Sequence, residues 1–97
     1  MAKILLLDEV TVAGPSDLTF TVSDTHQTVE AEGLSDGELL AIQKLKIDGL
    51  SYKDYRPDGK TVFLSNLHPE VNIFGKGTYR VNLLEIPKAA VSCSATE

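Results

Sequence analysis

The feature that most constrains the fold is a turn with two glycines followed by an alternating run, together residues 74–83. Tyr79, Val81 and Leu83 fall on one side of an extended chain, and the polar residues between them fall on the other. A period of two is typical of a β-strand with one face on a core, whereas a helix needs a period of about 3.6 residues. The run therefore predicts a half-buried β-strand.

The position of Tyr79 adds a second constraint. It comes shortly after the glycine turn and precedes the apolar Val81 by two residues. The tyrosine corner of immunoglobulin-like sandwiches has a similar arrangement, in which the phenol hydroxyl bonds to the backbone. We therefore expect Tyr79 in the core, with its hydroxyl bonded to the main chain.

Similar short runs, in which apolar and polar residues alternate, recur along the chain. Turn signals such as Gly14-Pro15 and Asp58-Gly59 separate them, and an Asp-Gly pair accepts the positive φ angles of a hairpin turn. Turn signals at intervals of about 8–12 residues predict an all-β antiparallel β-sandwich of about seven to eight short strands, immunoglobulin-like or jelly-roll-like. The expected core takes one apolar set from these runs: Phe20, Val22, Val29, Ile42, Val62, Leu64, Ile73, Tyr79, Val81 and Leu83.

One segment, residues 35–49, fits two structures. A capping box over residues 35–38 and apolar residues at helical spacing favour a helix. As a strand, the apolar residues of 40–42 and 45–47 would fall on opposite faces, which requires a bulge at residues 43–44. The residues alone do not decide between helix and strand, and the resemblance described below favours the strand.

The chain of 97 residues is expected to form a single domain, residues 1–97. Residues 1–9 contain the apolar run Ile4-Leu5-Leu6-Leu7, which fits either a first strand or an arm that inserts into a partner. The alternation favours the strand, and the run is shorter than the roughly 7–15 residues of a signal-peptide core. Residues 88–97 are small and polar and are expected to fray.

Composition disfavours several classes of partner. The net charge of −5 repels phosphate backbones, so nucleic-acid binding is not expected. No apolar run approaches the length that crosses a membrane, so no membrane partner is expected. Cys93 is the only cysteine, so no intrachain disulfide can form, which suits a reducing cytoplasm. We expect Cys93 to be an incidental small residue near the polar tail.

Residue patterns typical of catalysis or metal binding are missing. His26 and His68 lack a second ligand at zinc spacing, and Asp24-Thr25-His26 is a weak cue because catalytic triads are assembled from distant segments. The stretch Gly75-Lys76-Gly77-Thr78 departs from the phosphate-loop pattern, since Gly77 separates the lysine from the threonine. The sequence therefore predicts a protein that is not an enzyme and takes no metal or cofactor.

The best local candidates for partner binding are Tyr52, Tyr55 and Arg56. Tyrosine and arginine are enriched in protein interfaces, although tyrosines also favour strands and pack in sheets. Together with Ile4, Leu5, Leu6 and Leu7, these three residues are the expected partner-binding set.

A series of short motifs runs through residues 10–83. The motifs are Val10-Thr11-Val12-Ala13-Gly14-Pro15, Gly33-Leu34, Ile42-Gln43-Lys44, Tyr55, Asp58-Gly59, Val62-Phe63-Leu64-Ser65, and the stretch from Val71 to Val81 that includes Gly75-Lys76-Gly77-Thr78-Tyr79-Arg80. In this order they resemble a family of small virion proteins of tailed bacteriophages. The resemblance implies a β-sandwich that serves as a capsid decoration or cement protein, or as another minor head component, and it carries no catalytic residue.

The resemblance also implies a partner and a location. The expected partner is the major capsid protein, with the protein itself a homo-oligomer, dimer or trimer. It would be made in the host cytoplasm and lie on the capsid surface of the virion. The alternative is a carbohydrate- or receptor-binding surface module of a virion, with Tyr52, Tyr55 and Arg56 as its site, which the absence of tryptophan disfavours.

Overall fold

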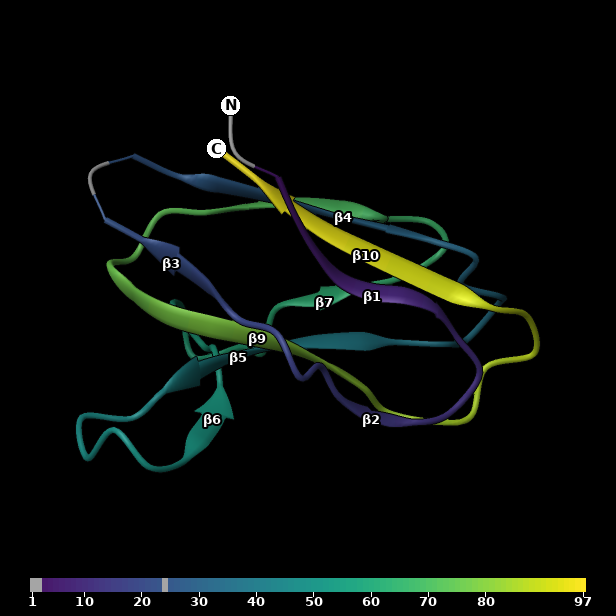
Figure 1. The fold of residues 1–97 in the computed structure, drawn as a ribbon, viewed down its shortest axis with the longest axis horizontal. Helices are drawn as coiled ribbons and strands as arrows, with labels where there is room; N and C mark the ends of the chain where they lie inside the picture. The colour runs from purple at the N-terminus through teal and green to yellow at the C-terminus, as the bar shows by residue number, and fades with distance from the viewer. Residues whose placement is uncertain (1–2, 24) are drawn as a thin grey trace.

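The structure, a computed structural model, describes residues 3–23 and 25–97, which form two antiparallel β-sheets around a common core (Figure 1). The strands are β1 (Lys3–Val10), β2 (Gly14–Pro15), β3 (Phe20–Val22), β4 (Gln27–Glu32), β5 (Leu40–Leu45), β6 (Tyr52–Asp54), β7 (Phe63–Leu64), β8 (Glu70–Ile73), β9 (Gly77–Leu83) and β10 (Val91–Thr96). No residue in the described ranges is helical, so the expected all-β antiparallel fold is confirmed. The strands exceed the expected number because β10 lies where fraying was expected and β2 is a two-residue pairing, too short for alternation to reveal.

One sheet, here sheet A, has the strand order β1-β10-β4-β8. Its strand β10 lies between β1 and β4 and alternates buried and half-buried residues, with Val91, Cys93 and Ala95 buried. The expectation that residues 88–97 fray is therefore wrong for residues 91–96. Small residues misled it, because a strand in the middle of a sheet can pack small side chains against large neighbours.

The apolar run at the start of the chain forms part of β1, which pairs with β10. The register shifts between Leu5 and Leu7, and this bulge explains why the adjacent Leu6 and Leu7 are both buried. Within residues 3–9 the run is therefore a first strand of the domain, as its alternation favoured, and not a free arm. Residues 1–2 lie outside the described ranges.

The second sheet, sheet B, has the order β2-β9-β5-β6, with β3 also paired to β9 and β7 to β5. Strand β9 pairs with β2, β3 and β5, which makes it the centre of this sheet. Tyr79, Val81 and Leu83 are all buried on its inner face. The alternation of residues 78–83 thus predicted both the strand and its buried side.

The ambiguous segment contains strand β5, as the resemblance favoured. Its register is unbroken through residues 43–44 on both sides, so the expected bulge is absent. The two apolar sets are accommodated differently: Leu45 is half-buried opposite Tyr52, and Ile47 lies beyond the strand in an exposed turn. The capping-box hydrogen bond exists without a helix, since the Ser35 N–H donates to Glu38 Oε1 at 2.8 Å.

The core fills the space between the two sheets. Of the expected core residues, only Val62 is not buried, and it packs against the cluster from its edge. The core residues absent from the expected set are Leu6, Leu7, Ala31, Leu40, Val91, Cys93 and Ala95. Most of these belong to β1 and β10, whose pairing joins the two ends of the described chain.

Candidate functional site

Tyr55 belongs to the core edge, not to an open surface. Its ring packs edge-on against Tyr79, with ring centroids 5.2 Å apart, and it is half-buried. The Tyr79 hydroxyl donates to the Gly75 carbonyl at 2.5 Å, the backbone bond expected for this tyrosine. Burial, reinforced by the neighbouring Tyr55, raises the pKa of Tyr79 to about 12. The Tyr79 phenol is therefore a structural group, neutral at physiological pH.

Tyr52 lies on the outer face of sheet B. The Arg80 guanidinium sits over its ring, 4.2 Å from the centroid, so one face of the ring is already covered. Arg80 Nε donates to Gln43 Oε1 at 2.8 Å, and Gln43 Nε2 donates to Asp54 Oδ1 at 3.2 Å. These residues form a ladder of polar contacts across the strands that holds Tyr52 in place.

The expected cluster of Tyr52, Tyr55 and Arg56 does not converge on one site. Tyr52 lies on the outer face, whereas Tyr55 contacts Tyr79 in the core. Arg56 donates from Nη2 to the Gly59 carbonyl at 2.8 Å and so braces its own turn. The three residues therefore do not form a common aromatic platform.

The leucine run offers only one accessible side chain. Leu6 and Leu7 are buried and Ile4 is half-buried, whereas Leu5 is 44% exposed. Leu5 pairs with Ser94, which places it on the face of sheet A that points away from sheet B.

A groove follows the edge where β1 and β2 meet, which we call the β1–β2 groove. It encloses about 490 Å³. Val12 and Leu18 on its walls are 67% and 55% exposed. Alternation grouped Leu18 with the buried Phe20, but β3 begins only at Phe20 and Leu18 lies in the preceding loop. The residues lining the groove are Leu5, Leu6, Leu7, Asp8, Val10, Val12, Ala13, Gly14, Pro15, Ser16, Asp17 and Leu18.

The turn between β5 and β6, residues 46–51, displays two more apolar side chains. Ile47 is fully exposed and Leu50 is 87% exposed. Asp48 Oδ1 accepts N–H bonds from Leu50 and Ser51, and the Leu50 bond is the main reason that the pKa of Asp48 is lowered. Sequence reasoning missed this tip, although the Asp48-Gly49 turn signal placed both neighbours at a bend.

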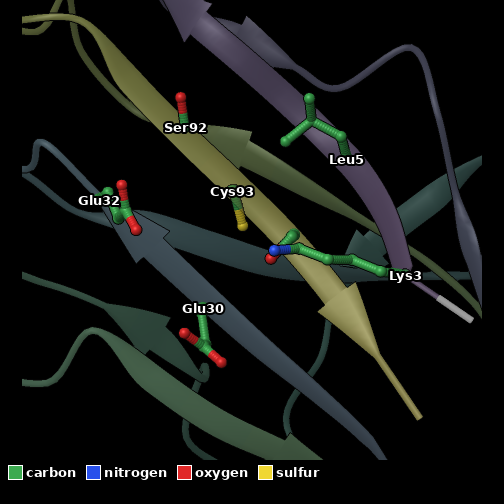
Figure 2. A pocket seen from close by; sticks show the side chains of 7 residues that line it. Lys3, Leu5, Glu30, Glu32, Ser92 and Cys93 are labelled. Atoms are coloured by element: carbon green, nitrogen blue, oxygen red, sulfur yellow. The ribbon is translucent and has the colours of Figure 1, made fainter. Parts of the chain in front are cut away.

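The outer face of sheet A carries a small recess of about 150 Å³ (Figure 2). Glu30 and Glu32 on β4 stand on one side of β10, and Lys3 and Leu5 on β1 stand on the other. Ser92 and Ser94 of β10 lie between them. The recess is therefore mostly polar, with a rim of carboxylates and hydroxyls.

Cys93 lines the recess from below but is only 1% exposed. Burial, with a smaller contribution from Glu30, raises the pKa of the Cys93 thiol to about 12. A thiol that stays protonated at neutral pH is a poor nucleophile. Cys93 is thus a core residue of β10, not the incidental tail residue that its position in the sequence suggested.

Glu38 is the one buried acidic side chain, at 3% exposure, among the described residues. Its carboxylate accepts N–H bonds from Ser35 and Lys88, each at 2.8 Å. These bonds, that of Ser35 first, lower the pKa of Glu38. A carboxylate held ionised by two backbone donors fastens loops together and is poorly suited to accept or release protons near neutrality.

The two histidines lie apart from these features. His26 is half-buried against the exposed Phe74 ring, with centroids 5.2 Å apart, and His68 is exposed. Asp24, the acidic member of the weak triad cue, lies outside the described residues. Within residues 3–23 and 25–97, no group of three His, Cys, Asp or Glu side chains is placed to hold a metal ion.

The described part of the chain has no helix long and apolar enough to cross a membrane. A scan against protein-family models, a search of curated proteins and a search of solved structures each returned no match. The features that point to a function are therefore the exposed surfaces of the chain and the motif resemblance described above.

Proposed function

We propose that this protein is a structural component of a tailed-phage virion, a capsid decoration or cement protein that binds the major capsid protein and stabilises the head. The proposal includes self-association and a place on the capsid surface. The motif series supplies the virion context. The observation that carries the binding role is the β1–β2 groove, because its walls expose apolar side chains along a sheet edge.

The groove suits a partner strand that forms backbone hydrogen bonds with β1 and also packs its side chains into the groove. Strand β1 pairs only with β10 among the described strands, so its other edge keeps unpaired N–H and C=O groups. Such an edge accepts a further strand, and apolar pockets beside it add specificity. Val12 and Leu18 would lose exposed apolar surface on binding, which stabilises a complex by about 25 cal/mol per Å². Repeated copies on a symmetric shell would add avidity.

The alternative of a carbohydrate- or receptor-binding module has less support. Sugar sites offer open aromatic faces among polar groups. Here the Tyr52 ring is covered on one side by Arg80, and Tyr55 packs against Tyr79.

Purified particles with and without the protein, imaged at low resolution, test the proposal. We expect extra density on the capsid surface, lost when Val12→Asp and Leu18→Asp are combined. Leu67→Asp is the control, because Leu67 is more exposed than Val12 or Leu18 and does not line the groove. A full-length protein that never copurifies with particles would contradict the capsid role.

A further inference from the structure

The β5–β6 turn carries the two most exposed large apolar side chains among the described residues, Ile47 and Leu50. The hairpin projects from the lower left of the body in Figure 1, away from β4 and β10. Two large apolar side chains exposed within one short turn make it a candidate interaction site. We call residues 46–51 the hairpin tip.

The tip is held in one shape before anything binds. Asp48 accepts the Leu50 N–H at 2.9 Å and the Ser51 N–H at 3.3 Å. Across the turn, the Lys46 N–H donates to the Ser51 carbonyl at 2.8 Å. Because the turn is already ordered, docking it loses little conformational entropy.

Three lysines lie in or beside the turn, one of them with its ammonium over the Tyr79 ring. Lys44 and Lys53 lie directly opposite on β5 and β6, and Lys46 follows at the start of the turn. Like charges at opposed positions destabilise a sheet. An anionic partner would relieve that repulsion. The tip therefore fits a surface whose acidic side chains surround an apolar contact for Ile47 or Leu50.

The charges of the chain are unevenly distributed along its sequence. Residues 44–80 contain seven Lys and Arg against four Asp and Glu, a net charge of +3. All other residues contain two Lys against ten Asp and Glu, a net charge of −8. Because Glu70 of the net-positive stretch lies on β8 beside β4, this division holds along the sequence only, and the acidic surface has to be located in the structure.

The acidic counterpart lies on the outer face of sheet A. Glu30 lies opposite Glu70 on β8 and next to the recess, whose rim includes Glu32. Leu5 gives the recess an accessible apolar side, and among the described residues Lys3 is the only cation that lines it. The recess of about 150 Å³ is small, so one side chain of the tip fits it. We call Leu5 and these three glutamates the acidic face.

We propose that the hairpin tip of one copy docks on the acidic face of a second copy. Ile47 or Leu50 contacts Leu5 at the recess, and Lys46 and Lys53 face the glutamates. The contact joins two different surfaces, so it is heterologous and repeats head to tail, giving a ring or a filament. This deepens the self-association in the proposed function without requiring the capsid role.

Sedimentation velocity of the purified full chain at rising concentration tests the contact. We expect the mean mass to rise above the 10.5 kDa of one copy, and added salt to reverse the rise. The tip variant Ile47→Ser with Leu50→Ser should weaken association by about tenfold or more. The matched control Ile86→Ser with Leu67→Ser also replaces one exposed isoleucine and one exposed leucine, and should leave association unchanged.

A mixing experiment tests the head-to-tail geometry. The tip variant keeps an intact acidic face, and the face variant Glu30→Lys with Glu32→Lys keeps an intact tip. Each alone should stay monomeric, whereas an equimolar mixture should form a 1:1 complex that does not grow. Circular dichroism of each variant checks that it folds.

Several results would overturn the inference. They are a wild-type monomer at every soluble concentration, an equal effect of tip and control variants, or no complex in the mixture of folded variants. Binding of the tip to phosphatidylglycerol vesicles without self-association would assign the tip to an anionic lipid surface instead. A wild-type protein that stays monomeric but still binds particles would overturn this inference alone and leave the capsid role standing.

Discussion

Single side chains in this protein gain structural roles through burial. Cys93 is the clearest example, because its side chain on β10 is buried in the core and the pKa of its thiol is raised from 9.0 to about 12. Tyr79 behaves similarly, with its pKa raised from 10.0 to about 12. Both groups are neutral in the folded protein at pH values where the unfolded chain would ionise them.

We expect stability to fall in alkali, beginning with Cys93. A raised native pKa means that the stabilisation is complete below pH 9.0 and is lost as pH rises toward about 12, because only the unfolded thiol releases its proton there. Chemical denaturation between pH 9 and pH 10 should show a smaller loss for Cys93→Ala than for the wild type. Tyr79 would add its own loss above pH 10.0. Identical slopes for the two proteins would contradict the role of the thiol.

Tyr79→Phe tests the backbone bond of the same residue. Removing the hydroxyl leaves the Gly75 carbonyl without this donor and should lower the free energy of unfolding by about 1–2 kcal/mol. Tyr52→Phe is the matched control, since its ring contact with Arg80 needs no hydroxyl. Thermal or urea unfolding measures both, and equal effects would count against the bond.

At the scale of elements, two connections cross between the sheets and touch. The β4–β5 connection and the β9–β10 connection meet where Gly33 lies against Ala90, and a Cβ on Gly33 would stand 2.1 Å from the Ala90 carbonyl oxygen. Gly33 also has a φ of +90°, a conformation that side chains disfavour. The close approach of the two connections thus depends on a missing side chain.

Gly33→Ala should destabilise the fold more than Gly37→Ala. Gly37 has a similar φ of +82° but nothing within 4 Å of an added Cβ, so the comparison isolates the steric clash from backbone strain. We expect the difference in unfolding free energy to be about 1–3 kcal/mol, the usual cost of overpacking. Urea denaturation of the two variants measures it, and equal losses would show that the connections can separate freely.

At the scale of the whole molecule, Glu38 fastens the two sheets at one end. It lies in the β4–β5 connection, and its carboxylate accepts the Lys88 N–H of the β9–β10 connection. Because its pKa is lowered, the stabilisation is present above the ordinary value of 4.5 and is lost as pH falls below it.

The melting temperature of the wild type should therefore fall more steeply than that of Glu38→Gln between about pH 5 and pH 3. Ser35 and Lys88 donate to different oxygens of Glu38, Oε1 and Oε2, and the amide nitrogen that replaces one of them cannot accept, so the variant should also melt lower at pH 7. Glu32→Gln, an exposed glutamate on β4, serves as control and should melt like the wild type. Parallel curves for Glu38→Gln and the wild type would remove Glu38 from this role.

The alternation of apolar and polar residues predicted the strands that have one solvent-facing side and one buried side, such as β4 and β9. It also predicted most of the core. It did not place β10, because the serines and alanines there are the small residues of a strand packed between larger neighbours. The expected tyrosine and arginine cluster failed for another reason: distance along the chain is not distance across a sheet, and Tyr52 and Tyr55 end on different sides of sheet B. The groove and the hairpin tip depend on which apolar residues lie past strand ends, and only the structure locates those ends.

The pairing of β1 with β10 has a consequence for how the protein is made. Glu9 and Ser92, which share a hydrogen bond, are 83 residues apart, so β1 leaves the ribosome long before its partner exists. Until residues 91–96 are synthesised, β1 and its apolar Leu6 and Leu7 lack the strand with which they pair. Contacts between such distant segments also slow folding. The nascent chain therefore exposes an apolar strand until residues 91–96 are made, and this strand is where a chaperone would bind first or aggregation would begin.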